Sequence, residues 1–504
     1  MEWIRQRKKT LVSLFALQVI CYAYFFTVPL LSNHTFPNVW LYNYPSFKTS
    51  SEGRWFADLV ILFQGSSGVQ SFQFVCAVML QAVNGLLFAD LLRIRETRAR
   101  FFLAGVLCLY PSFLDYYCFA CDHITFVLGD TLCLIAALFW MRSVNKVSRI
   151  AVPALLYVLS MAAYGPKIAL VLFLSIGALI LRLQQIRDTS NLRILLGELI
   201  SNIITVFLAV LALWITLKIT VTFDGGPRSH INSVQEIISG IKMAYNSAIA
   251  YYSNGVGGFP AKIEWLPAGV IFLGCIYLVL NATKKGFACL GLTLVMLLLI
   301  PLILQSPWII NNLSPANVAR IGAVFGYAIV FFIAIVMRLV RPGWIGESLA
   351  AIFLYFFILL ATQQNNAACF KSIYEGNIIN RIVERCDTVF QPWGGMDVPV
   401  VIIGEYPPFE VGKYVKYPPQ HWIHEISTPT FAPYRQVEIL NFFEGKQIFR
   451  KPTSEEVKTA LESAVGRIPW PSPNSVFMAR GIMIVLLQPS VPGVKTTWDQ
   501  MKMN

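Results

Sequence analysis

Carboxylates and cations gather in two short polar segments of an otherwise apolar chain: Glu52, Arg54, Trp55 and Asp58 in the first, and Asp115, Asp122 and His123 in the second. A carboxylate can remove a proton from a hydroxyl group, and a guanidinium can grip a phosphate through two parallel hydrogen bonds. Residues of these types predict acid–base chemistry on a substrate that carries phosphate. A local ion pair between Glu52 and Arg54 in a solvated loop is the alternative.

The second segment places Asp115 and Asp122 seven residues apart. If this stretch is helical, both carboxylates lie on one face about two turns apart. One would then act as base while the other orients a substrate hydroxyl. The competing interpretation makes them solvated loop acids, or makes Asp122 the cap of the apolar run that follows.

Two further cations stand at expected turns. Lys167 ends the sequence Tyr164–Gly165–Pro166–Lys167, and Arg320 precedes a late apolar run. Each would either hold a lipid phosphate or place its charge at the membrane interface with its stem in apolar surroundings. No group of ligands predicts a metal site, because His421 and His424 have no paired Cys or His nearby.

Composition identifies what must position these residues. Of the 504 residues, 56% are hydrophobic and only 13% are charged, against roughly 25% charged in soluble domains. The apolar residues form runs of roughly 17–25, which is the length that crosses the hydrocarbon core of a bilayer. The net charge of +13 lies in clusters between these runs, where it sets orientation, so we expect membrane lipids and no nucleic acid as partners.

We therefore predict an all-α polytopic membrane domain of about eleven transmembrane helices. Basic residues before the first run place the N-terminus in the cytoplasm, and the run is too long for a cleaved signal peptide. The expected spans are about 11–31, 72–92, 101–113, 123–141, 150–163, one ending at Arg182, 195–221, two flanking Lys284–Lys285, one ending at Arg338, and 345–360.

The composition changes near Thr362, where Lys, Glu, Pro and Gly become more frequent. We expect residues 1–361 to form the catalytic membrane domain and residues 362–504 a soluble extracytoplasmic α/β domain. Its expected elements are strands at Val398–Ile403 and Val476–Gln488, the latter interrupted near Gly481, and helices at Asn377–Arg385 and Ser454–Val465. A disulfide between Cys369 and Cys386 is chemically allowed on that side of a membrane. The spacing of the two cysteines does not decide whether it forms.

The sequence resembles the Gtr-type serotype-conversion glucosyltransferases of the GT-C class. Three places carry the resemblance: Gly53–Arg54–Trp55 ending the first outer loop, the two acids seven apart, and the sequence LSMAAYGPK around Tyr164. The segment Asn33–Asn38 departs from the family pattern, since it holds no acid where a pair of aspartates is expected. Glu52 becomes the nearest substitute in that loop.

The resemblance implies a GT-C-like fold in a bacterial inner membrane and transfer of glucose from undecaprenyl-phosphate-glucose to lipid-linked O-antigen on the periplasmic side. It implies Glu52 or Asp115 as base, Asp122 as the acid that orients the sugar, and Arg54 and Lys167 at the phosphate. Other candidates for substrate binding, which include aromatic residues that would stack on sugar or pack against lipid, are Trp40, Trp55, Asp58, His123, Tyr164 and Arg320. No cofactor is implied beyond the donor substrate.

A different class of function is a transporter or flippase for a lipid-linked saccharide. Asp130, Glu198 and Glu347 lie in or near expected spans, where ionisable groups often serve transport. The chain has no symmetry between two halves of the kind that many transporters show, and the polar residues cluster outside the spans. A structural partner in an envelope complex is the third alternative.

Overall fold

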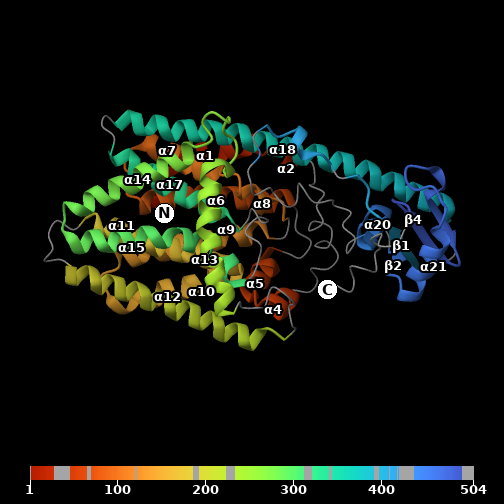
Figure 1. Cartoon of the computed structure of the whole chain (residues 1–504), viewed down its shortest axis with the longest axis horizontal. Coiled ribbons are helices and arrows are strands. Elements are labelled where there is room, and N and C mark those ends of the chain that lie inside the picture. The colour runs from red at the N-terminus through yellow and green to blue at the C-terminus, as the bar shows by residue number, and fades with distance from the viewer. Residues whose placement is uncertain are drawn as a thin grey trace. The chain divides into compact units, whose positions relative to one another are not determined.

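The computed structural model describes residues 2–27, 46–64, 70–119, 122–185, 192–222, 233–311, 321–339, 343–390, 397–407, 409–416, 418, 436–445 and 447–490. Trp40, Arg320, His421 and His424 lie outside these ranges. The chain forms two compact units (Figure 1). We call them the helical unit (Met1–Thr27, Asn43–Asn365, Val415–His424) and the sheet unit (Val28–Tyr42, Asn366–Tyr414, Glu425–Asn504).

The helical unit contains long apolar helices, and the last of them, α18, continues from this unit into the sheet unit. In chain order the helices are α1 (Glu2–Cys21), α2 (Tyr24–Thr27), α4 (Ser46–Glu52), α5 (Trp55–Gln64), α6 (Gln70–Leu91), α7 (Thr97–Cys108), α8 (Phe113–Tyr117), α9 (His123–Arg142), α10 (Lys146–Ala163), α11 (Ile168–Leu183), α12 (Leu192–Thr220), α13 (Val234–Ala250), α14 (Leu266–Thr283), α15 (Phe287–Leu304), α16 (Ser306–Asn311), α17 (Ala323–Leu339) and α18 (Gly343–Val389). A 3₁₀ turn (η1, Gly165–Lys167) follows α10, and a π-helix (η4, Tyr251–Gly255) follows α13.

Within the described ranges, eight helices are long and apolar enough to cross a membrane, and α17 is a shorter apolar helix. The protein is therefore membrane-embedded, as the composition indicates. The expected count of eleven spans is not confirmed. Helix α7 has 12 residues and is only about 18 Å long, and the apolar part of α1 begins at Leu11 and ends with the helix at Cys21, about 16 Å later.

Helix α9 packs against α6, α10 and α11 in the helical unit (Figure 1). Most of its side chains are buried, including the charged Asp130. Helix α12 is different, because its large apolar side chains Ile203, Phe207 and Trp214 are exposed. Such a surface would be costly in water but suits the hydrocarbon of a bilayer.

Cations cap the carbonyl groups at one end of the helical unit. This end, which we call the basic end, is formed by the C-termini of α6, α9 and α11. Lysine and arginine side chains stabilise the last carbonyls of a helix by hydrogen bonding and by favourable interaction with its dipole. The contacts are Arg149 Nε to Trp140 O (2.8 Å), Lys285 Nζ to Leu183 O (3.0 Å), Arg182 to Met141 O and Arg338 to Leu92 O.

The sheet unit holds a four-stranded sheet of order β2-β1-β4-β3, in which β1 is parallel to β2 and β4 while β3 and β4 are antiparallel. Its elements are β1 (Val398–Ile403), η6 (Val411–Lys413), α20 (Gln436–Glu444), β2 (Phe449–Arg450), α21 (Ser454–Ala464), η8 (Pro473–Ser475), β3 (Val476–Ala479) and β4 (Ile482–Leu486). Both predicted strands are confirmed. The interruption at Gly481 is a two-residue hairpin turn in which Arg480 and Gly481 both have positive φ, the geometry that favours glycine there.

The helix predicted at Ser454–Val465 is confirmed as α21, and Thr453 caps its N-terminus. The Thr453 hydroxyl accepts a hydrogen bond from the Glu456 amide, and the Glu456 carboxylate accepts one from the Thr453 amide at 2.7 Å. Arg450 also donates to Glu456, with Nη2 2.6 Å from Oε1. The hydrogen bond from Arg450 is the main reason that the pKa of Glu456 is lowered to about 2.

The expected boundary between a last span and a tail helix is absent, because α18 runs without a break from Gly343 to Val389. Cys369 and Cys386 both lie on this helix and are free thiols. Seventeen residues of α-helix separate them by about 25 Å, whereas a disulfide needs Cα atoms within about 7 Å. The disulfide that the sequence left open is therefore excluded.

Candidate active site

A tight turn between α4 and α5 carries the first group of candidate residues. Gly53 has a φ of +66°, and a Cβ added there would lie 2.0 Å from the Leu217 side chain on α12. Glycine adopts this left-handed conformation without the strain that a side chain would bring. The Arg54 amide then donates to Lys48 O at 3.0 Å, which brings Glu52 and Arg54 together beside α4.

Among the described residues, four charged side chains meet next to this turn, and we call them the charged cluster: Lys48, Glu52, Arg54 and Asp122. Lys48 Nζ lies 2.5 Å from both carboxylate oxygens of Asp122, and both side chains are more than nine-tenths buried. Arg54 bridges the two acids, with Nη1 3.2 Å from Glu52 Oε2 and Nη2 3.5 Å from Asp122 Oδ1. The two positive and two negative groups balance, so these four side chains taken together are formally neutral.

The predicted local ion pair between Glu52 and Arg54 thus exists, but it is part of a larger arrangement. Sequence reasoning missed Lys48. It lies four residues before Glu52, so both residues lie on one face of α4. That spacing was the only available signal, because the partner of Lys48 at Asp122 is 74 residues away.

The guanidinium of Arg54 is fixed by more than its ion pairs. Its Nε donates to Ala163 O, the last residue of α10, at 3.0 Å. The central guanidinium carbon of Arg54, Cζ, lies 5.3 Å from the ring centroid of Tyr164 and 5.8 Å from that of Phe126. These contacts hold a planar cation with bidentate geometry at the start of α9 and the end of α10.

Lys167 lies near this cluster, beyond Tyr164, and is buried rather than placed at an interface. Its Nζ donates to the Tyr116 hydroxyl at 2.6 Å and pairs with the carboxylate of Asp130, which is almost completely buried. It also lies 6.0 Å from the ring centroid of Tyr164. A small cavity is lined by Tyr116, Asp130, Tyr164, Pro166, Lys167, Leu170, Ile321, Ala323 and Val324.

Asp58 supports the turn. Its carboxylate accepts hydrogen bonds from the Thr49 amide at 2.9 Å and from the Thr49 hydroxyl at 2.5 Å. Burial raises the pKa of Asp58 above its ordinary value, although these hydrogen bonds oppose the rise. The structure therefore gives Asp58 a role in joining α4 to α5.

Asp115 and Asp122 do not share one helix, which was the condition for their seven-residue spacing to place both on one face. Helix α8 ends at Tyr117 and α9 begins at His123. Asp115 is fully buried on α8. Asp122 occupies the cap position of α9, but its side chain makes no capping hydrogen bond and pairs with Lys48 instead.

Two other candidates have mainly aromatic neighbours. The buried ring of His123 makes edge contacts with Phe74 and Tyr117, at centroid distances of 6.1 and 6.5 Å. The Trp55 ring makes an edge contact with Phe56 at 6.0 Å. Trp40 and Arg320 fall outside the described residues, so their predicted roles stay predictions.

Comparison with known proteins identifies the family. The model of the family Glucosyl transferase GtrII matches residues 38–333, which is more than half of the chain and includes the charged cluster, Asp130 and Lys167. The chain belongs to this glucosyltransferase family. No curated protein and no solved structure matched the chain.

Proposed function

We propose that this member of the GtrII glucosyltransferase family transfers glucose from undecaprenyl-phosphate-glucose to a sugar hydroxyl of lipid-linked O-antigen, at the periplasmic face of a bacterial inner membrane. The observation that carries the proposal is the neutral charged cluster beside Tyr164. It combines a reachable carboxylate with fixed cations at one end of the apolar helices. The membership of the chain in this family supports an enzyme of the glycosyltransferase class.

Glu52 is the acid best suited to act as base. Its side chain is 27% exposed, whereas that of Asp122 is 6% exposed and Asp115 is fully buried. A base must come within hydrogen-bonding reach of the hydroxyl that it deprotonates, which favours the most accessible carboxylate. Asp122, held by Lys48 and Arg54, would position these cations and orient a sugar.

The charges balance in a single transfer step. The acceptor oxygen bonds to C1 of glucose as the bond from C1 to the phosphate oxygen breaks, and the acceptor proton moves to Glu52. Glu52 becomes neutral while the departing polyprenyl phosphate gains one negative charge. Arg54, which Glu52 no longer neutralises, can then stabilise that phosphate, and such stabilisation of developing charge is a large term in enzyme catalysis.

The buried pair of Lys167 and Asp130 adds a further cation near Lys48 and Arg54. Its proximity to Tyr164, which also faces Arg54, joins the pair to the charged cluster through one aromatic ring. We propose that Lys167 contributes positive potential to the phosphate site while Asp130 keeps it neutral before substrate arrives. A buried cation without a partner would be costly.

The proposed side of the membrane follows from the distribution of cations. The basic end gathers Arg149, Arg182, Lys285 and Arg338 around helix C-termini. By the positive-inside rule such an end faces the cytoplasm. The charged cluster lies where α9 begins and α10 ends, at the other end of those helices, and therefore faces the periplasm.

The test measures transfer of labelled glucose from polyprenyl-phosphate-glucose to O-antigen in membranes that hold matched amounts of each variant. We expect Glu52→Gln to lower the rate about 10²- to 10⁴-fold, the usual contribution of a general base. Glu96→Gln removes an exposed carboxylate near the basic end and should leave the rate unchanged. Wild-type membranes that transfer no glucose would refute the proposal, and an active Glu52→Gln would refute the role of Glu52.

Sidedness has its own measurement. A water-soluble short-chain donor is added outside sealed right-side-out and sealed inverted vesicles. Transfer in the right-side-out vesicles alone is expected. Transfer in the inverted vesicles alone would place the reaction on the cytoplasmic side.

A further inference from the structure

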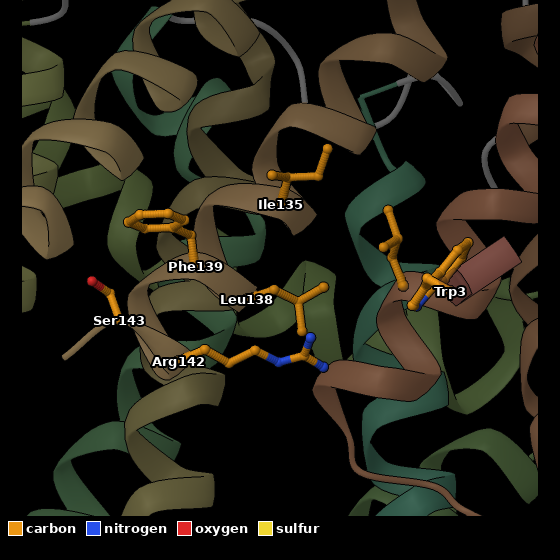
Figure 2. A pocket seen from close by; sticks show the side chains of 7 residues that line it. Trp3, Ile135, Leu138, Phe139, Arg142 and Ser143 are labelled. Carbon is orange, nitrogen blue, oxygen red and sulfur yellow. The ribbon is translucent and has the colours of Figure 1, made fainter. Parts of the chain in front are cut away.

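A second cavity lies at the basic end, between α1, α6 and α9 (Figure 2). Its volume is about 420 Å³, within the range of about 300–1,000 Å³ that is typical of ligand sites. In Figure 2, Leu138 and Arg142 extend from α9 toward Trp3 on the facing helix. The cavity is lined by Trp3, Leu87, Ile135, Leu138, Phe139, Arg142 and Ser143.

The lining combines an apolar wall with a single charge. Ile135, which is 40% exposed, lies on the outer surface of α9, where hydrocarbon would surround the protein. Two turns further along the helix, Arg142 occupies the last turn of α9. The cavity therefore runs from a lipid-facing surface to a cation near the membrane interface.

The neighbouring acid, Asp90, is already paired with other side chains. Asp90 accepts a hydrogen bond from Trp3 Nε1 at 2.7 Å and pairs with Arg7 at 3.0 Å and Arg100 at 3.9 Å. Within the described ranges, no carboxylate pairs with Arg142, whose side chain is exposed. The positive charge of Arg142 is therefore available to a ligand.

Other arginines add to the positive potential. Burial lowers the pKa of Arg93, and repulsion from Arg182, Arg142 and Arg95 lowers it further, so these four charges lie near one another. Of the four, Arg182 has a carboxylate partner, Glu198, at 3.7 Å. An excess of like charge at one place favours an anionic ligand.

We propose that this cavity binds an anionic phospholipid, with one acyl chain along Ile135 and Leu138 and its phosphate at Arg142. The site is separate from the charged cluster and independent of the reaction proposed there. Clusters of arginine beside membrane helices attract anionic lipid headgroups, and the apolar wall adds the recognition of a hydrocarbon chain. Bound lipid would stabilise the association of α1 with α6 and α9.

The experiment follows the thermal stability of the full chain in detergent as phosphatidylglycerol is added, with phosphatidylcholine and inorganic phosphate as comparison ligands. A ligand that binds only the folded state raises the midpoint of unfolding in a saturable way. Phosphatidylglycerol alone should do so in the wild type. Native mass spectrometry counts the retained lipid in parallel.

Two variants test the phosphate contact and the apolar wall of the cavity separately. Arg142→Gln should weaken the response to phosphatidylglycerol about tenfold, the loss expected for one charged phosphate contact, and Ile135→Trp should abolish it by filling the cavity. Lys146→Gln removes another exposed cation four residues away and should respond like the wild type. Equal responses from Arg142→Gln and wild type, an equal effect of phosphatidylcholine, or an equal effect of inorganic phosphate would overturn the proposal.

Discussion

Replacing Asp122 by asparagine removes the carboxylate that Lys48 and Arg54 share. Lys48 Nζ is 2.5 Å from both oxygens of Asp122, and Arg54 Nη2 is 3.5 Å from one of them. The amide is almost the same size, so the packing of the site is preserved. The change isolates the charge of one side chain.

The geometry sets the size of the effect. At an effective dielectric constant of about 20, one charge pair is worth about 7 kcal/mol at the Lys48 distance and about 5 kcal/mol at the Arg54 distance. Relaxation and water entry recover part of this loss, and breaking a buried pair on one side costs about 3–5 kcal/mol. We expect Asp122→Asn to destabilise the protein by that amount and to lower glucose transfer at least tenfold.

A double-mutant cycle tests the reasoning. Lys48→Met alone should also be strongly destabilising, because it leaves the buried Asp122 carboxylate without its closest described cation and with Arg54 at 3.5 Å. The double variant removes one charge of each sign and leaves Glu52 paired with Arg54. Its cost should fall short of the sum of the single costs by about 2–3 kcal/mol.

The assay is unfolding of the purified full chain in mixed micelles by added sodium dodecyl sulfate, followed by tryptophan fluorescence, with Glu96→Gln as control. Strictly additive costs would show that Lys48 and Asp122 do not interact as the structure has them. A fully stable and active Asp122→Asn would refute the positioning role of the carboxylate.

Three further predictions concern other residues. Arg54→Lys keeps the charge but loses the planar fork that stacks beside Tyr164, so kcat/KM for glucose transfer should fall about tenfold or more; an unchanged value would contradict bidentate binding of phosphate. Lys167→Met leaves the Asp130 carboxylate buried and should cost about 3–5 kcal/mol of stability in the same unfolding assay, and adding Asp130→Asn should restore much of it; no restoration would argue against the pair. Glu456 has a folded-state pKa below its unfolded value of about 4.5, so its stabilisation is present above pH 4.5 and is lost as the pH falls toward 2. Hydrogen exchange of residues 449–464 in the full chain, corrected for intrinsic rates, reports the free energy of local opening. This free energy should be about 1 kcal/mol lower in Glu456→Gln than in wild type at pH 7, and the difference should shrink below pH 4.5. A difference that does not change with pH would contradict the ion pair.

Several features of the fold were predictable because they depend on neighbouring residues in the sequence. Apolar runs gave most of the membrane-length helices, and the two buried strands of the sheet unit followed from short apolar segments beside turn residues. Helix ends were less predictable. The basic residues before the first apolar run are already helical, because α1 begins at Glu2. Helix α18 continues through Thr362, where the composition suggested a boundary. Whether a helix continues depends on packing as well as on residue type.

The sequence alone indicated that this protein is built from apolar helices and that cations collect between them. Its polar candidates were Glu52, Arg54, Asp58, Asp115, Asp122, His123, Lys167 and Arg320. These conclusions need only local hydrophobicity, charge and spacing. Tertiary structure decided which groups are paired. Lys48 meets Asp122 across 74 residues and Lys167 meets Asp130 across 37, and such distant partners depend on how whole helices pack, which no local pattern records.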